Sequence, residues 1–123
     1  MRGYTVVTSA VALEVEYKWL DNLLSHHSVT GVRQSRQGVA RTLPYSSLRI
    51  LAVALELIGG LQTPLPYALT WAHRIDAGEN PCTTGSLTVT VDLIRIDRWL
   101  SGRLAYAVEV APTPRRGRPP KEE

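Results

Sequence analysis

The stretch TSAVALEVEYKWLDNLLSH, residues 8–26, contains two short helical patterns with a brief break between them. The first pattern covers residues 8–13, and Thr8 or Ser9 is suited to cap its start. The second covers residues 17–26. Helices with so short a connection must cross steeply and share a small core, so this stretch predicts a helix-turn-helix. Three leucines share the inner face of the second helix: Leu20, Leu23 and Leu24.

The next segment, residues 32–43, is rich in Arg, Gln and Ser around Gly38, with strand-like ends and a turn-like middle. This pattern predicts a β-hairpin whose polar tip projects into solvent or onto a ligand. A third helix follows, and Gly59 and Gly60 are expected to end it because glycine tolerates the left-handed helix cap. The apolar stripe of this helix consists of Leu48, Leu51, Leu55 and Ile58.

Thr63 and Pro64 predict the start of a fourth helix, since a capping hydroxyl precedes a proline at the first helical position. That helix should close within residues 76–78. Residues 76–86 are expected to form a loop, and the alternating residues 87–91 predict a short strand.

Asp92 is suited to cap a fifth helix, which continues as an apolar stripe at helical spacing. Gly102 lies inside this helix and costs it roughly 1 kcal/mol. The pattern therefore leaves open whether residues 93–110 form a helix or whether a second strand lies near residues 104–110. The stripe consists of Leu93, Ile96, Leu100, Leu104 and either Ala107 or Val108.

The composition is that of a globular protein. A length of 123 residues favours one domain with at most a short appendage, and 44% hydrophobic residues suffice for a core. No apolar run approaches the ~18 residues that span a bilayer, and the N-terminus has no secretion-signal pattern. The single cysteine, Cys82, cannot form an internal disulfide. We therefore expect a protein of the reducing cytoplasm without a membrane segment.

The positive charge is concentrated in two segments that contain no acid. Residues 28–49 hold four arginines, and residues 112–121 hold three arginines and one lysine. Together they carry eight of the 14 basic side chains, although the net charge of the whole chain is only +3. Segregated positive charge is typical of a protein that binds a polyanion, while two solvated loops are the alternative.

Several positions in the N-terminal half follow a family pattern. Tyr4, Thr5 and Val6 begin it with an aromatic, a threonine and an aliphatic residue. Ala10, Val15 and Leu20 hold the packing positions of the helix pair, residues 43–48 (LPYSSL) lead into the third helix, and residues 59–61 (GGL) precede the fourth. In these features residues 4–75 resemble the MerR-like winged helix-turn-helix family. The resemblance implies a DNA-binding fold with a recognition helix and an arginine-rich wing.

The chain also departs from that family. Glu14 stands where the family has a turn glycine, so the bend needs another support. The long dimerising coil of the metal- and drug-sensing members is absent. The resemblance therefore implies DNA binding rather than effector sensing.

The resemblance implies that helix 17–26 lies in the major groove, where its first turns meet base edges. Asn22 can pair with adenine, Lys18 can bond guanine, and Tyr17 can touch a phosphate or a thymine methyl. Asp21 lies among them and repels phosphate, so an amphipathic helix with its polar side outward is the alternative. The wing residues expected to contact phosphates or the minor groove, or else to be solvated surface groups, are Arg33, Gln34, Arg36, Gln37 and Arg41.

The C-terminal residues 114–121, PRRGRPPK, look like an AT-hook, whose core is Arg-Gly-Arg-Pro. Arg115, Arg116 and Arg118 would reach along a narrow A·T minor groove, while Gly117 lets the backbone lie against its floor. A generic basic tail or a proline-motif ligand is the alternative. No core residue follows position 111, so this tail is expected to be disordered when alone.

No pattern predicts a catalytic or metal site. His26 and His27 are adjacent and point about 100° apart on a helix. Cys82 and His73 supply too few ligands for zinc. There is no P-loop, nucleotide-binding glycine pattern or nucleophile elbow, so neither enzymatic activity nor a cofactor is expected.

The sequence thus predicts a mainly α protein with a small β wing. Residues 1–78 are expected to form a winged helix-turn-helix DNA-binding domain. Residues 79–111 are expected to form a strand-helix appendage that can dimerise, and residues 112–123 a disordered basic AT-hook-like tail.

We expect sequence-specific binding to double-stranded DNA, as in a bacterial or phage transcriptional regulator associated with the nucleoid. One such module buries only roughly 600–1,000 Å² on DNA, so a homodimer or a cooperative array is expected. A protein-interaction or antitoxin-like adaptor that uses residues 87–110 is the alternative, as is an excisionase-like architectural protein. The residues available for a dimer interface, unless they dock on the winged domain, are Leu93, Ile96, Trp99, Leu100 and Leu104.

Overall fold

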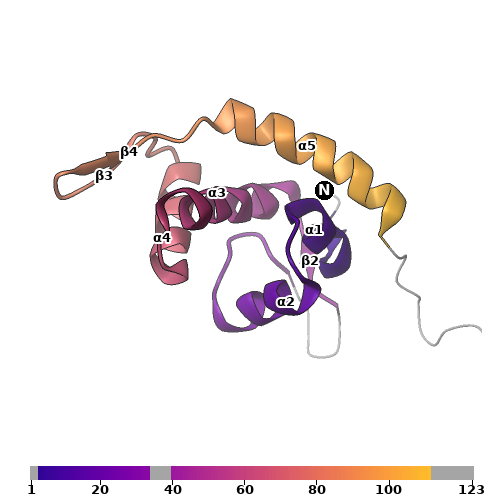
Figure 1. The fold of residues 1–123 in the computed structure, drawn as a ribbon. Helices are drawn as coiled ribbons and strands as arrows, with labels where there is room; N and C mark the ends of the chain where they lie inside the picture. The colour runs from indigo at the N-terminus through magenta and orange to yellow at the C-terminus, as the bar shows by residue number, and fades with distance from the viewer. Residues whose placement is uncertain (1–2, 34–39, 112–123) are drawn as a thin grey trace, which may run out of the picture.

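The computed structural model describes residues 3–33 and 40–111, in which helices pack around one core beside two small antiparallel sheets (Figure 1). The fold is therefore mainly helical with a small β component, as predicted. Within these residues no helix is long and apolar enough to cross a membrane. In chain order the elements are β1 (Tyr4–Thr5), α1 (Val6–Leu13), α2 (Tyr17–His26), β2 (Thr42–Leu43), α3 (Tyr45–Leu61), α4 (Leu65–Asp76), β3 (Cys82–Thr84), β4 (Leu87–Val89) and α5 (Leu93–Val110).

The first helix begins earlier than its sequence pattern indicates. Thr5 has an extended backbone, and its Oγ1 accepts a hydrogen bond from the N–H of Thr8 at 3.0 Å. Ser9 donates its hydroxyl hydrogen to the carbonyl oxygen of Thr5 at 2.7 Å. The expectation that Thr8 or Ser9 caps this helix is wrong, because the pairing of β1 with β2 already gives Thr5 the backbone that an N-cap requires.

Glu14 itself makes the bend between α1 and α2. It adopts the left-handed conformation (φ 62°, ψ 41°), and its N–H donates to the carbonyl oxygens of Ala10 and Val11. The N–H of Val15 donates to the same Ala10 oxygen at 3.0 Å. A left-handed residue other than glycine is unfavourable, so further contacts must support this turn.

Arg103 of α5 supplies that support. Its Nη2 donates to the carbonyl oxygen of Val11 at 2.7 Å, and its Nε donates to that of Ala12 at 3.2 Å. The Nε also lies 3.3 Å from a carboxylate oxygen of Glu14. Arg103 therefore caps the C-terminal end of α1, where carbonyl groups lack helical partners and where the helix dipole favours a positive charge.

The two ends of the predicted hairpin pair with each other. Arg33 and Thr42 exchange two backbone hydrogen bonds, each 2.9 Å long. Thr42 also pairs with Thr5, since β2 runs antiparallel to β1. The base of the hairpin is thus tied to the strand that precedes the first helix, while residues 34–39 lie outside the described part of the chain.

The third helix passes through the two glycines that were expected to end it. Gly59 and Gly60 are both helical, and the left-handed cap falls on Gln62 (φ 54°, ψ 38°). The N–H of Gln62 donates to the carbonyl oxygen of Leu57. The expectation was wrong because glycine permits a left-handed cap without requiring one, whereas Pro64 is the residue that stops a helix here.

Residues 82–84, which were expected to lie in a loop, form β3 and pair with β4. Gly85 (φ 58°) stands in the turn between the two strands. Strands of three residues are too short to show clear alternation, which is why the pattern missed the first of them. The hairpin projects from the helical body (Figure 1), and its base is held by Asn80, whose side-chain amide exchanges two hydrogen bonds with the backbone of Val91.

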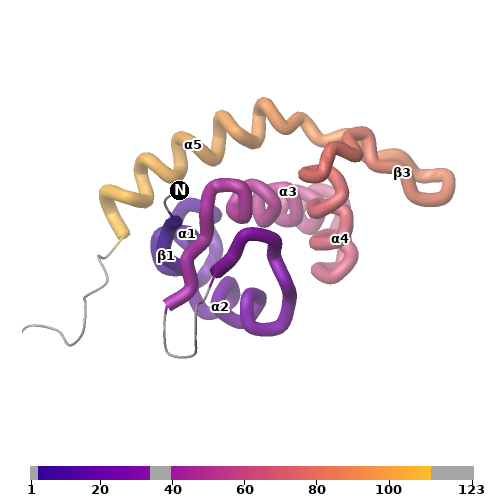
Figure 2. Tube along the Cα trace, turned by 180° about the vertical axis from the view of Figure 1, so that it is seen from behind, coloured from indigo at the N-terminus to yellow at the C-terminus, as the bar shows by residue number. Residues whose placement is uncertain are grey.

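The last element, α5, is helical over its whole length, so the alternative strand near residues 104–110 is wrong. Asp92 caps it as predicted, since Oδ1 accepts a hydrogen bond from the N–H of Arg95 at 3.1 Å. The helix lies along α1 and α3 (Figures 1 and 2). The segments 1–78 and 79–111 therefore contribute to the same core.

This docking corrects the predicted dimer interface. Ile96, Leu100 and Leu104 are buried within their own chain, and Leu93 is partly buried. Of the five residues proposed for the interface, Trp99 alone remains exposed. The stripe is not available to a second copy, because it covers α1 and α3.

Candidate nucleic-acid interface

The three helix residues expected to meet DNA bases are presented by α2. Its inner side is anchored by leucines in the core. Tyr17, Lys18 and Asn22 are all exposed and lie in the first two turns of the helix. The helix therefore offers polar side chains from a rigidly packed support.

Arg41 joins the hairpin to α2. Its Nη1 lies 3.1 Å from Oδ1 of Asp21, and its Nη2 donates to the hydroxyl oxygen of Ser25 at 3.2 Å. The two side chains are 22% and 37% exposed, and an ion pair that solvent still reaches in this way contributes little to stability. The ion pair has a larger effect on the surface charge, because Arg41 offsets the negative charge of Asp21, which lies between Lys18 and Asn22 on α2.

Arg33 is exposed at the base of the hairpin. Arg41 and the β1–β2 pairing hold the base of the hairpin near α2. The hairpin base and α2 therefore both lie on the side of the molecule away from α5 (Figures 1 and 2). The predicted site residues that lie outside the described part of the chain are Gln34, Arg36, Gln37, Arg115, Arg116, Gly117 and Arg118.

Two side chains that the sequence patterns did not single out as supports hold the connection between α2 and the hairpin. Ser47 is fully buried, and its hydroxyl donates to the carbonyl oxygen of Thr30 at 2.5 Å. The N–H of Thr30 donates to Nε2 of His73 at 3.2 Å, while Nδ1 of His73 lies 2.9 Å from the carbonyl oxygen of Leu69. These contacts suit the neutral tautomer with its proton on Nδ1. Thus α3, through Ser47, and α4, through His73, hold the connection that leads from α2 into the hairpin.

Gly31 completes this connection. Its φ is +95°, and a Cβ at this position would lie 2.5 Å from the hydroxyl oxygen of Ser47. Both the left-handed backbone and the close approach therefore require glycine.

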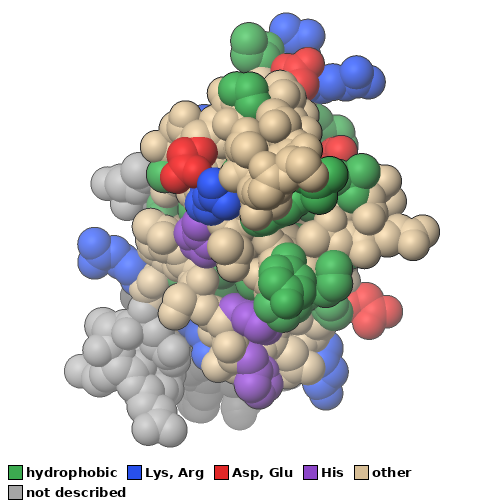
Figure 3. All heavy atoms as spheres, turned by 90° about the vertical axis from the view of Figure 1, so that its left-hand side faces the viewer, with side chains coloured by type: hydrophobic (Ala, Val, Ile, Leu, Met, Phe, Trp, Pro, Cys, Tyr) green, Lys and Arg blue, Asp and Glu red, His purple; other side chains and the backbone are tan. Residues whose placement is uncertain are grey.

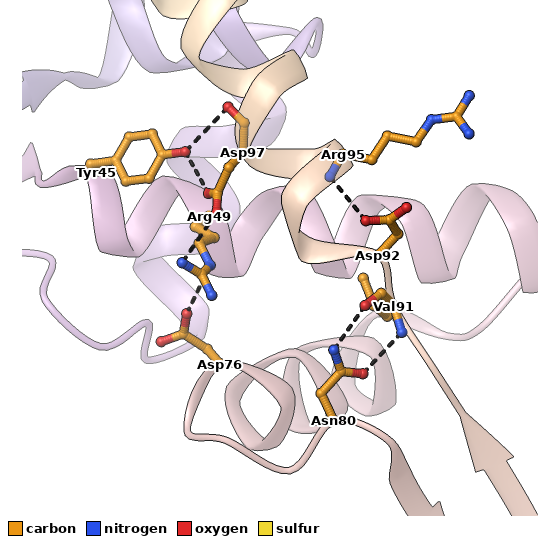
Figure 4. Close-up of polar contacts among 8 residues, drawn as sticks. All are labelled: Tyr45, Arg49, Asp76, Asn80, Val91, Asp92, Arg95 and Asp97. Carbon is orange, nitrogen blue, oxygen red and sulfur yellow. Dashed lines mark hydrogen bonds and ion pairs between the residues drawn. The ribbon is translucent and has the colours of Figure 1, made fainter.

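A polar cluster joins α3, α4 and α5 (Figure 4). The hydroxyl of Tyr45 donates to Oδ1 of Asp97 at 2.6 Å. The guanidinium of Arg49 lies 3.4 Å from the Asp97 carboxylate and 3.5 Å from that of Asp76. Burial, and then the hydrogen bond with Asp97, raise the pKa of Tyr45 above its ordinary value, so its hydroxyl remains a donor at neutral pH.

These ion pairs reduce the free positive charge of residues 28–49, the segment without acidic residues. Two of its four arginines, Arg41 and Arg49, are paired with carboxylates from other parts of the chain. Around α2 and the hairpin base, the cations without an ion pair within residues 3–33 and 40–111 are Lys18 and Arg33. In the part of the chain that the structure describes, the basic surface formed by unpaired cations is therefore smaller than the composition indicates, and it lies beside α2.

No cluster of three or more His, Cys, Asp or Glu side chains converges as a metal site within the described ranges. Histidine side chains are instead spread along the face shown in Figure 3. No protein-family model, curated protein or solved structure matches this chain.

Proposed function

We propose that this protein binds double-stranded DNA in a sequence-specific manner, as a winged helix-turn-helix transcriptional regulator. The observation that carries the proposal is the exposure of Tyr17, Lys18 and Asn22 on a firmly packed α2 that lies beside the hairpin base. A helix fits the major groove and meets base edges with its first turns. The resemblance to MerR-like proteins supports the same placement.

Each of the three helix residues matches a chemical group of DNA. The side-chain amide of Asn22 both donates and accepts, as adenine requires in the major groove. Lys18 can donate to the acceptors of guanine, and Tyr17 can reach a phosphate or a thymine methyl. A well-placed bidentate contact between a side chain and a base, such as that of asparagine with adenine, discriminates against a wrong base by about 1–3 kcal/mol.

The ion pair between Arg41 and Asp21 supports this interface in two ways. It offsets the charge of Asp21, which would otherwise repel phosphate. It also fixes the hairpin relative to α2, so that Arg33 can approach the DNA backbone while α2 lies in the groove. In this proposal Gln34, Arg36 and Gln37 extend the wing along the same backbone.

We further propose that the protein acts in the cytoplasm, associated with the nucleoid, as a homodimer or a cooperative array. A lone module buries only roughly 600–1,000 Å² on DNA, and a second copy supplies a second DNA-binding surface. The proposal involves no cofactor and no enzymatic activity.

A protein-interaction or antitoxin-like adaptor is the second candidate, and one observation favours it. Ile94 on α5 is 73% exposed, and Leu87 on the projecting hairpin is 61% exposed. Exposed apolar side chains on these two elements are available for contact with a protein partner. Such an adaptor would bind its partner without the strong salt dependence of DNA binding. An excisionase-like architectural protein would share the DNA contacts but would bend its site.

The wing can be tested through the salt dependence of binding. Replacing Arg33 and Arg36 with alanine is expected to flatten the slope of log affinity against log salt concentration by about 1.8, since each lost phosphate contact removes about 0.9. Fluorescence anisotropy of a labelled duplex over a salt series measures this slope. Asn22→Ala should leave the slope unchanged while weakening discrimination between sequences, because it removes a base contact.

Arg98→Ala is the matched control for the wing variant, since it removes an exposed arginine from α5, a helix that lies on the opposite side of the molecule from α2 (Figures 1 and 2). Its slope should equal that of the wild type. If the wing variant also keeps the wild-type slope, these arginines do not contact DNA and the proposed placement of the hairpin is incorrect.

The tail can be tested by comparing flanking sequences. Removing residues 112–123 should reduce affinity most for a probe whose core site is flanked by A·T runs, since narrow A·T grooves attract arginine. Gly117→Ala keeps every charge but blocks the close approach of the backbone, so it should reproduce much of that selective loss. Equal losses on A·T and G·C flanks would indicate an ordinary basic tail that acts through counterion release.

A further inference from the structure

The outward face of α5 is unoccupied within the described chain. The inner stripe of this helix packs on α1 and α3, yet Trp99 and Tyr106 are 42% and 51% exposed. In both views α5 lies on the opposite side of the molecule from α2 (Figures 1 and 2). This face therefore remains accessible while α2 is on DNA.

Gly102 lies in the middle of α5 on this outward face. Glycine inside a helix costs roughly 1 kcal/mol relative to alanine. A Cβ at Gly102 would meet no atom within 4 Å in the described chain, so no intramolecular packing requires the glycine. A second helix that crosses α5 at this point would benefit from it, because the absence of a side chain lets two backbones approach closely.

Two of the charges along the same face, Arg95 and Glu109, are placed symmetrically about that glycine, while Arg98 on this face has no acidic counterpart. Arg95, Gly102 and Glu109 are spaced seven residues apart, so they lie almost on one line along the helix. Arg95 and Glu109 are exposed, and neither forms an ion pair within residues 3–33 and 40–111. A line with a cation at one end and a carboxylate at the other is complementary to itself when reversed.

We propose that the outward face of α5 binds α5 of a second copy in an antiparallel arrangement, with the two-fold axis at Gly102. Arg95 of each copy then faces Glu109 of the other, and the two glycines meet at the crossing. Trp99 and Tyr106 are also seven residues apart, so they follow one edge of the same face. The two-fold axis brings Trp99 opposite the second copy's Tyr106, which adds an aromatic contact on each side.

The aromatic edge is already ordered before the second copy binds. The guanidinium carbon of Arg103 lies 5.0 Å from the centroid of the Tyr106 ring, so one side of that ring is held by its own chain. The other side can pack against the incoming Trp99. Because this order exists within one chain, less side-chain entropy is lost when the pair forms.

This arrangement has a consequence for DNA, which rests on the proposed function. The outward face points away from the helical body, so the two bodies lie on opposite sides of the α5 pair. The two α2 surfaces then point away from each other. One dimer would therefore bridge two duplexes rather than grip adjacent half-sites on one straight duplex.

Sedimentation of the full chain without DNA tests the pairing. We expect the wild type to dimerise and each single charge reversal, Arg95→Glu or Glu109→Arg, to weaken dimerisation by about tenfold, since each creates two like-charged contacts. The double variant, Arg95→Glu with Glu109→Arg, should restore dimerisation to nearly the wild-type level. A monomeric wild type, or a double variant as weak as the singles, would overturn the proposal.

Gly102→Leu separates pairing from folding. The space around Gly102 is open within one chain and leucine is the better helix former, so the melting temperature at low protein concentration should be unchanged or higher. Dimerisation should nevertheless be lost, because the side chain holds the two helices apart. A Gly102→Leu variant that still dimerises would place the interface elsewhere.

A pull-down with two differently labelled duplexes tests the bridging. The wild type should recover the second duplex with the first, while Gly102→Leu should bind one duplex without recovering the other. If the chain dimerises but binds no duplex, the proposed function fails and the α5 pairing stands. If it binds duplexes as a monomer, the pairing fails and the proposed function stands.

Discussion

Leu100→Ala should lower the free energy of unfolding by about 2–5 kcal/mol, the range measured when a large aliphatic side chain is removed from a core. Leu100 lies on the inner face of α5, and none of its surface is exposed. The helix covers α1 and α3, so the cavity left by the missing atoms would open in the centre of the molecule. Chemical denaturation followed by circular dichroism measures the change.

Val108→Ala is the matched control for this variant, because it removes aliphatic atoms from the same helix at a side chain that is 60% exposed. It should change the free energy of unfolding by less than about 0.5 kcal/mol. Leu100→Ala should also keep a single cooperative transition, since α5 shares its core with the other helices. A loss below about 1 kcal/mol, or two separate transitions, would show that α5 is an independent appendage.

Arg103→Met should destabilise the protein by about 2–3 kcal/mol, because it removes hydrogen bonds from a charged donor to two helix-end carbonyl groups. Methionine keeps much of the aliphatic stem, so the loss reports chiefly the polar contacts to Val11 and Ala12. The same denaturation measurement applies. The left-handed turn at Glu14 should loosen as well, which faster hydrogen exchange at the end of α1 would reveal.

Glu14→Gln separates the two roles of Arg103. Glu14 has a side chain that is 57% exposed, so losing its ion pair alone should cost no more than about 1 kcal/mol. Glu14→Gly should be neutral or stabilising, since glycine adopts the left-handed conformation without strain. If Arg103→Met costs no more than Glu14→Gln, the carbonyl contacts contribute nothing to stability.

Features that depend on neighbours along the chain were predictable. The 3.6-residue spacing of leucines indicated α2 and α3, and Asp92 identified the start of α5 because an N-cap acts on the next turn. Where a local signal allows two outcomes, the prediction failed or stayed open. Gly59 and Gly60 were compatible with a cap and with a continuing helix, and the hydrogen-bonded strand at residues 82–84 was too short to be seen.

The candidate DNA surface was predictable in its helix and less so in its charges. Tyr17, Lys18 and Asn22 are exposed because the leucines of the same amphipathic helix turn inward, which is a property of the sequence itself. The partner of Arg41 is Asp21, 20 residues away, and only the paired ends of the hairpin bring them together. An acid-free run therefore overstates the free positive charge.

By itself the sequence determined that α2, α3 and α4 are helical, which side of α2 is polar and where α5 is capped, since these depend on contacts within a few residues. Only the tertiary structure decided what the helices cover and which charges remain free. Arg103 caps α1 from 92 positions away, and Arg49 of α3 meets carboxylates of α4 and α5. The physical reason is that burial and ion pairing depend on distances in space, which helix packing sets and residue spacing along the chain does not record.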